Sequence, residues 1–196
     1  MEIIVPCETI FRLSKILNGA EGSWNTLRFD NSCVVATDGR FMAIENVARF
    51  EGIAHIVPDA AFIAQCETES KFNSRVTIVV NEMLKYTVAK TSLGYVTTQN
   101  LYYDGELGDK WDKWREVVMR AADPAKKPNG GMFWNLDGIC KLIESSPSGS
   151  VVFEEVIDTL RPTLVRDTTD HSWLGVFSPM CKEQRYAPAT MPSWMK

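Results

Sequence analysis

The sequence lacks several features that mark common protein classes. No apolar run approaches the roughly 18 residues that a membrane-spanning helix needs, and residues 1–11 lack the basic and apolar regions of a signal peptide. The two histidines, His55 and His171, have no metal-ligand spacing, and no common nucleotide-binding, hydrolase or metalloprotease motif occurs. We therefore expect a cytoplasmic protein with no cofactor, no metal and no enzyme activity.

Paired cysteines and an excess of basic residues are also missing. The five cysteines are scattered singly, without a Cys-x-x-Cys pair, which argues against a disulfide framework and against a zinc site. The 21 Lys and Arg residues are outnumbered by 25 Asp and Glu residues, and the formal net charge of -4 is unlike that of a simple DNA-binding domain. Any nucleic-acid function must therefore depend on charge gathered on one face.

What the sequence does contain is a globular composition and an internal repeat. With 196 residues, of which 45% are hydrophobic, the chain is long enough for one domain or two small ones. Three stretches share one order, in which a β-favouring run is followed by a short amphipathic helix and then by strands. The three stretches begin with IIVPCETIFRLSKILNG, AHIVPDAAFIAQCETES and MFWNLDGICKLIESSPSG.

Each stretch carries apolar residues at helical spacing, which predicts a helix with one face packed on a sheet. These residues are Ile10, Leu13, Ile16 and Leu17 in the first stretch, Phe62, Ile63 and Cys66 in the second, and Leu136, Ile139, Leu142 and Ile143 in the third. The runs that follow alternate apolar and polar residues, as antiparallel strands with one packed face do. We expect an α+β fold of three βα-plus-antiparallel-meander units, with the helices on one face of the sheets.

The repeat also predicts how the chain is divided. Two units, at residues 1–50 and 53–104, are expected to form one domain over 1–122 together with a connector. A third unit over 130–181 is expected to be half of such a domain. Residues 182–196 are expected to be a loosely ordered tail. The connector has a possible helical turn around Trp111 to Met119, followed by a stretch rich in Pro, Lys and Gly.

Five segments carry a resemblance to a known family by their order and spacing. They are VVATDGRFMAI, HIVPDAAFIAQC, YYDGELGDKWDKWREVV, MFWNLDGICKLIES and TLRPTLVRDTTDHSWLGVFSPM. In this order they resemble the bacterial β-type DNA polymerase sliding clamps, over residues 1–181. Clamp domains contain two units each, so the chain is similar to a short, divergent clamp with its last domain half present, of the kind that a phage would encode.

The resemblance implies that the helices line a central hole and that cations on or beside them face duplex DNA. The candidates are Arg12, Lys15, Lys71, Arg75 and Lys141. They would attract phosphates weakly and without sequence preference, so that a ring stays on DNA and still slides. The alternative is that these are ordinary solvated cations, because neighbouring glutamates dilute the positive field.

The resemblance also implies a pocket for short apolar peptides of DNA polymerase or other replication proteins, at the junction between two domains. The matching positions are Thr37, Gly39, Arg40, Met42, Val117, Val176 and Ser178, with Pro179 and Met180 alongside. An apolar junction with a few polar groups is where a peptide anchor gains most from desolvation. Plain core packing of Met42, Val117 and Val176 is the alternative.

The function expected on these grounds is that of a sliding-clamp-like processivity or tethering factor, which encircles double-stranded DNA and binds replication proteins. Three units are too few to surround a duplex, so closure requires a homo-oligomer; the family's rings contain about a dozen units, which four chains would supply. Two alternatives stay open. One is a clamp-fold protein-binding module, such as a phage decoy or adaptor, that does not encircle DNA. The other is an enzyme such as a metal-dependent nuclease.

Overall fold

The computed structural model describes residues 1–20, 25–47, 50–81, 83, 86–100, 113–121, 136–154 and 162–177. The described helices are α1 (Cys7–Ser14), α2 (Ala60–Ser70), α4 (Trp114–Ala121) and α5 (Leu136–Ser145). The described strands are β1 (Glu2–Pro6), β2 (Leu27–Asp30), β3 (Cys33–Thr37), β4 (Phe41–Asn46), β5 (Ile53–Ile56), β6 (Arg75–Asn81), β7 (Tyr86–Thr91), β8 (Val96–Asn100), β9 (Val151–Phe153), β10 (Thr163–Asp167) and β11 (Trp173–Phe177). The expected tail, Ser178, and the strand expected just before α5 lie outside these residues.

The strands form two antiparallel sheets in which the first two units exchange their first strands. The smaller sheet has the order β1-β6-β7-β8, so β1 of the first unit pairs with β6 of the second, Ile3 opposite Ile78. In return, β5 of the second unit pairs with β2 of the first, Leu27 opposite Ile56. The sequence does not predict this exchange, which joins the two units through strand pairs as well as through side chains.

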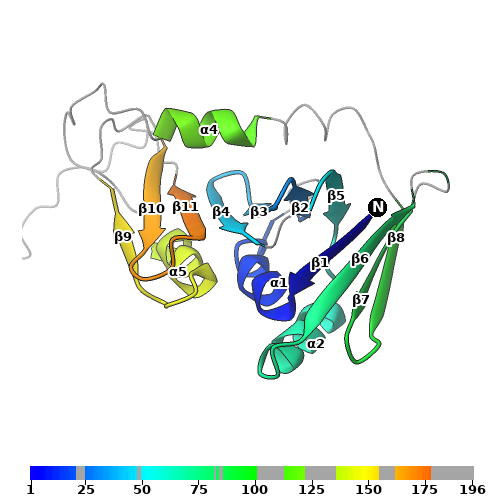
Figure 1. Cartoon of the computed structure of the whole chain (residues 1–196). Coiled ribbons are helices and arrows are strands. Elements are labelled where there is room, and N and C mark those ends of the chain that lie inside the picture. Colours follow the sequence, from blue (N-terminus) through cyan, green and yellow to red (C-terminus); the bar gives the residue numbers. More distant parts are fainter. Residues whose placement is uncertain are drawn as a thin grey trace, which may run out of the picture.

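The third unit continues the sheet of the first unit. The larger sheet has the order β5-β2-β3-β4-β11-β10-β9, and its middle pair is β4 with β11, where Ala43 lies opposite Gly175. Three helices, α1, α2 and α5, lie on one side of the sheets, whereas α4 lies on the other side of the larger sheet (Figure 1). The α+β class with helices on one face of antiparallel sheets is therefore confirmed, with α4 as an addition on the opposite face.

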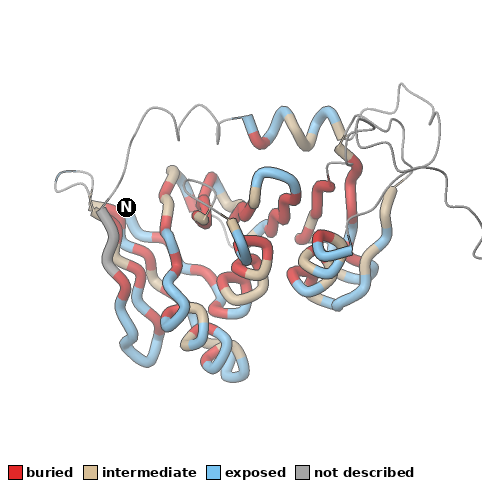
Figure 2. The backbone as a smooth tube through the Cα atoms, turned by 180° about the vertical axis from the view of Figure 1, so that it is seen from behind, coloured by how far each residue is buried: buried red, intermediate tan, exposed pale blue. Residues whose placement is uncertain are grey.

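The main core lies where α1 and α2 meet each other and the sheets. Ile10, Leu13 and Ile16 are fully buried there, as the helical spacing of the first stretch predicts. The second helix begins at an N-cap in which Asp59 accepts a hydrogen bond of 2.7 Å from the backbone N–H of Phe62. Phe62 then packs in the same core. The buried residues lie where these helices and the sheets face one another, whereas α4 is buried mainly at its first residue, Trp114 (Figure 2).

The expectation for the third helix is wrong in part. Of its four stripe residues only Leu142 is buried, and Leu136 is 71% exposed. The helix instead meets the sheet through Gly138, where an added Cβ would lie 1.7 Å from the ring of Phe41. A glycine at this point lets the helix approach the ring closely, which turns the apolar stripe away from the sheet.

None of the helices in the described parts of the chain combines the length and the apolar character that crossing a membrane requires.

Candidate nucleic-acid face and protein-binding junction

The side of the molecule that carries α1, α2 and α5 holds four of the five cations expected to face DNA, and two of these four are engaged by carboxylates. Arg12 contacts Glu8 one helical turn away, and it donates to Glu45 of β4 at 2.8 Å. Lys141 of α5 donates to Asp38 at 2.7 Å. These ion pairs join helices to strands of the larger sheet, so both cations have a structural role.

The other three cations are more accessible. The ammonium group of Lys15 lies 4.2 Å from the ring centroid of Phe11, a cation–π contact that leaves the residue half-buried. Lys71, which follows α2, and Arg75, which begins β6, are exposed. Within the described residues neither of these two contacts a carboxylate. Lys15 and Lys71 therefore lie at the helical side, whereas Arg75 shares the outer side of β6 with Thr77 and Val79, opposite to the core-facing Val76 and Ile78.

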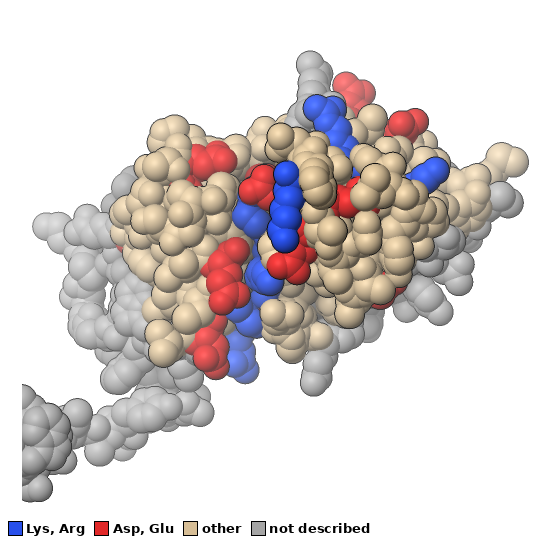
Figure 3. Space-filling model, turned by 90° about the horizontal axis from the view of Figure 1, so that it is seen from below, with Lys and Arg blue, Asp and Glu red and all other residues tan. Residues whose placement is uncertain are grey.

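The charge of this side is mixed. The three helices with the residues that follow α1 and α2 carry the carboxylates Glu8, Glu67, Asp137 and Glu144 and the cations Arg12, Lys15, Lys71 and Lys141, while a further carboxylate, Glu69, is fully buried. Acidic and basic side chains alternate in a band across the face (Figure 3). This face therefore carries no uniform positive charge.

The turn between β3 and β4 has a fixed geometry. The hydroxyl of Thr37 donates to the carbonyl of Phe41 at 2.7 Å and accepts from the N–H of Gly39 at 3.1 Å. The carboxylate of Asp38 accepts from the N–H groups of Arg40 and Phe41 at 2.9 and 2.8 Å. Gly39 has φ of 88°, a left-handed conformation that favours glycine. The turn therefore presents an exposed Gly39 and Arg40 beside the edge of the β4–β11 junction.

The outer face of the β4–β11 junction is covered by α4. Met42 lies opposite Val176 in the register, and both pack with Trp114 in a second apolar cluster. Val117 of α4 is half-buried against the same cluster. Six of the seven positions expected to form the peptide pocket thus lie around one junction. Met42 is only 8% exposed and Val176 only 2%, so their packing beneath α4 accounts for their apolar character without a bound peptide.

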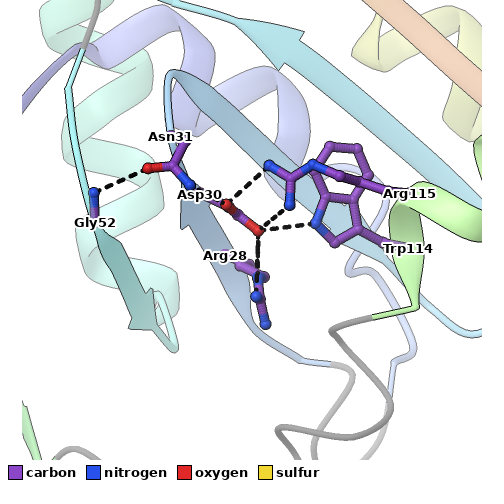
Figure 4. Close-up of polar contacts among 6 residues, drawn as sticks. All are labelled: Arg28, Asp30, Asn31, Gly52, Trp114 and Arg115. Carbon is purple, nitrogen blue, oxygen red and sulfur yellow. Dashed lines mark hydrogen bonds and ion pairs between the residues drawn. The ribbon is translucent and has the colours of Figure 1, made fainter.

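A buried carboxylate fixes α4 in this place (Figure 4). Asp30, at the end of β2, is 1% exposed and accepts from both terminal nitrogens of Arg115 at 2.9 Å. It also accepts from Nε1 of Trp114 at 3.1 Å and from Nε and a terminal nitrogen of Arg28 at 3.2 Å. A buried charge with donors from two directions is stabilised where an isolated one would not be.

The ionisation of Asp30 reflects these contacts. Burial by itself raises the pKa of this carboxyl, but the hydrogen bonds from Arg115 and Trp114, with the charges of Arg115 and Arg28, outweigh it and lower the pKa to about 2. Asp30 is therefore a carboxylate at neutral pH.

The sequence does not reveal this cluster. Asp30 with Asn31 is typical of a turn, and Trp114 and Arg115 fall within the expected connector. The partners are 84 and 85 residues away from Asp30, so no local spacing links them. The one available signal is a Trp-Arg pair at the start of a helical stretch, which offers several donors together.

The polar run at Asp167 to Ser172 is built as a structural turn. Asp167 accepts from the N–H and hydroxyl groups of Ser148 at 2.8 and 2.9 Å and from the N–H of Thr169 at 2.8 Å. Burial would raise its pKa, but these hydrogen bonds lower it below its usual range. Asp170 accepts from the N–H and hydroxyl of Ser172. In the described part of the chain, no three His, Cys, Asp or Glu side chains gather in a group that could hold a metal ion.

The comparisons with known proteins bear on the fold. No protein-family model matches the chain, and no curated protein matches its sequence. Solved structures that match include a DNA polymerase sliding clamp of Pseudomonas aeruginosa, at 16% identity with a TM-score of 0.56, covering 92% of this chain and 66% of the clamp. A DnaN sliding clamp of Bartonella birtlesii bound to griselimycin matches at 16% identity, with a TM-score of 0.53 and the same two coverages.

A third match is the β sliding clamp of C. crescentus, at 16% identity with a TM-score of 0.52, covering 92% of this chain and 66% of that one. The chain thus spans just under two thirds of the length of these clamps. The likeness agrees with the repeated units, the sheet that crosses from one unit into the next and the helices on a single side. The chain has the fold of the bacterial β sliding clamps.

Proposed function

We propose that the protein is a DNA sliding-clamp-like processivity or tethering factor, a short and divergent clamp of the kind that a phage encodes. It would encircle duplex DNA as a homo-oligomer and bind replication proteins through short peptides. The observation that carries this proposal is the clamp fold over 92% of the chain. The row of α2, α1 and α5 on one side of the sheets supplies the surface that would line the hole (Figure 1).

The mixed charge of the helical side suits this function. A closed ring is retained by its topology, so strong attraction to phosphates is unnecessary and would slow sliding. Lys15 and Lys71 are the accessible cations for weak contacts on this side, whereas Arg12 and Lys141 would contribute only partly neutralised charge. The acidic net charge of -4 is compatible with a protein that holds DNA in this way.

The peptide-binding part of the proposal concerns the β4–β11 junction. Gly39 and Arg40 are exposed at its edge, and Val117 of α4 is half-buried against the cluster of Met42 and Val176 on the outer face. A client peptide would contact this rim, with Met42 and Val176 forming the floor beneath. Thr37 would hold the turn in shape, and Ser178, Pro179 and Met180 would complete the pocket by their place in the sequence.

Retention on circular DNA tests the proposal. The protein would be assembled from dissociated subunits in the presence of a nicked circular plasmid, and the plasmid then cut once. A ring remains on the circle through gel filtration in moderate salt and is released after the cut. Equal retention on circular and linear DNA, or none on either, would contradict encirclement.

The ion pairs of Arg12 and Lys141 favour one second candidate, a clamp-fold protein-binding module that does not encircle DNA. Such a module needs no positive field on its helical side. It would show no difference between circular and linear DNA, and it would still bind a replication peptide at the β4–β11 junction.

A further inference from the structure

The third unit is an incomplete copy of a pattern that the same chain completes elsewhere. Outward from the central β4–β11 pair, the larger sheet continues with β3, β2 and β5 on one side but only with β10 and β9 on the other. β2 has β5 as its outer neighbour, a strand contributed by another unit. The corresponding strand β9 is the outermost of the described strands, so the sheet that these strands form is one strand short of a symmetric arrangement.

The helices are incomplete in the same place. α1 packs against α2, and Cys7 of α1 and Cys66 of α2 are both fully buried in the core between them. α5 contacts α1 and β4 on its inner side. Among the described elements no helix stands beside α5 as α2 stands beside α1, and α5 is the end of the row (Figure 1).

The unpartnered side of α5 is apolar. Ile139 and Cys140 come three and four residues after Leu136, and Ile143 comes four and three residues after them, which places the four residues along one side of the helix. Leu136 is 71% exposed and Cys140 is exposed, and the two isoleucines are only half-buried. On the neighbouring strand β9, the partly buried Val151 and Phe153 face the same side as α5, whereas Val152 between them points to the sheet face that carries α4. Exposed apolar side chains along a helix mark an interaction surface.

We infer that this surface, formed by the outer side of α5 and the outer edge of β9, the last strand of the described sheet, pairs with the same surface of a second copy of the chain, so that two half-domains make one complete domain. The template is the α1–α2 and β2–β5 pairing within this chain. Each copy gives the other a helix and a strand, as the first two units do. A twofold axis makes such an interface self-complementary, because the same residues occur on both sides.

This inference names one interface of the oligomer in the proposed function, but it rests on the fold and not on DNA binding. Two chains joined in this way contain six units, arranged as three complete domains. Such a pair presents the edge strand β8 of the smaller sheet at both ends, which leaves a place for further association.

The mass of the protein in solution tests the interface. Size-exclusion chromatography with light scattering at tens of micromolar is expected to give a multiple of the single-chain mass for the wild-type protein. Leu136→Lys or Cys140→Lys should halve that mass, because each places a charge in the apolar contact of α5. Met119→Lys is the matched control, since Met119 is 70% exposed on a helix of the opposite face, and its mass should equal that of the wild type.

Cross-linking through Cys140 is a second test that tolerates a labile complex. In a Cys33→Ser, Cys181→Ser background, a short bis-maleimide should join two chains, and Cys140→Ser should abolish the product. Cys7 and Cys66 would react slowly, because burial raises the pKa of Cys7 to about 11 and that of Cys66 further. A wild-type single chain, or a mass that neither lysine substitution changes, would overturn the inference.

The two proposals fail separately. If Leu136→Lys halves the mass but the wild-type protein is not retained on circular DNA, the interface stands and encirclement falls. If the protein is retained on circular DNA and neither lysine substitution changes its mass, encirclement is supported and the half-domain interface is contradicted.

Discussion

Asp30 connects two parts of the chain that are distant in sequence. Its carboxylate is buried at the end of β2, and its contacts with Trp114 and Arg115 hold the first turn of α4 against the larger sheet (Figure 4). Removing one member of a buried charged cluster leaves uncompensated charge behind, which is costly. The geometry of the whole outer junction therefore depends strongly on this side chain.

Asp30→Ala should lower the free energy of unfolding by about 3–5 kcal/mol, because the carboxylate that compensates the buried Arg28 would be removed. Urea denaturation followed by fluorescence measures the change. Glu116→Gln is the matched control, since it breaks only the exposed Glu116–Arg120 pair of α4 and should cost no more than about 0.5 kcal/mol. Equal destabilisation by the two substitutions would show that Asp30 does not hold the helix.

Acid should weaken the same cluster. Asp30 has a pKa of about 2 when folded, below its ordinary value of 3.8, so the unfolded chain takes up this proton first as the pH falls. The stabilisation is complete above about pH 5 and disappears as the pH falls through about 2, and it amounts to roughly 2 kcal/mol. Asp167, whose pKa is also lowered, acts in the same direction.

The measurement is urea unfolding of the wild-type protein and of Asp30→Asn between pH 6 and 2. The wild-type free energy of unfolding should fall more steeply, because the variant lacks one of the titrating groups. Parallel curves for the two proteins would contradict the assignment of a low pKa to Asp30.

The accessible cations of the helical side give a further prediction. A Lys15→Glu, Lys71→Glu double variant should bind short linear duplex DNA more weakly, and the slope of log affinity against log salt should fall by about one for each phosphate that is no longer bound. Lys113→Glu, an exposed residue before α4 on the opposite side, is the control and should behave as the wild type. A larger effect from Lys113→Glu would place DNA on the side of α4 instead.

At the scale of elements, α5 is seated on β4 through a glycine. Gly138→Ala would place a methyl group inside the space of the Phe41 ring. Alanine normally stabilises a helix relative to glycine by about 1 kcal/mol, but over-packing here should reverse the sign and destabilise by about 1–3 kcal/mol. Thermal unfolding measures this change.

Phe41→Leu tests the cause. If the ring is the obstacle, Gly138→Ala should be much less harmful in a Phe41→Leu background, and the double-mutant cycle should show coupling between the two sites. A strictly additive result would mean that the substitution acts through the helix alone.

The sequence predicts the helices and strands of each repeated unit, but it does not predict that the first two units exchange their first strands. Helical spacing identifies the buried residues of α1, and alternation identifies the antiparallel strands, because both depend on residues close in the chain. The pairing of β1 with β6 and of β5 with β2 depends on which of several similar strands meet, which periodicity does not encode. The third helix shows the same limit, because Gly138 against Phe41 turns its apolar stripe outward.

The candidate site divides in the same way. The turn from Thr37 to Phe41 can be predicted from sequence, because its glycine and its short polar side chains make local hydrogen bonds. The ion pairs of Arg12 with Glu45 and of Lys141 with Asp38 join residues 33 and 103 positions apart. Sequence reasoning therefore finds the cations but not the carboxylates that neutralise them.

At the scale of the molecule, two surfaces limit how copies can associate. The half-domain surface of α5 and β9 would join chains in pairs, and the β8 edges of such pairs remain available. Two pairs would bring together twelve units, the number that about four chains of a clamp-like ring require. A closed assembly of this kind would place the sides that carry α1, α2 and α5 toward one common centre.

An electron-microscopy image of the purified particle tests the proposed encirclement most directly. We predict class averages of a closed ring with a central hole wide enough for duplex DNA, absent in Leu136→Lys and kept in Met119→Lys. Compact wild-type particles without a hole, at concentrations where the protein is fully associated, would contradict the proposal that the chain acts by encircling DNA.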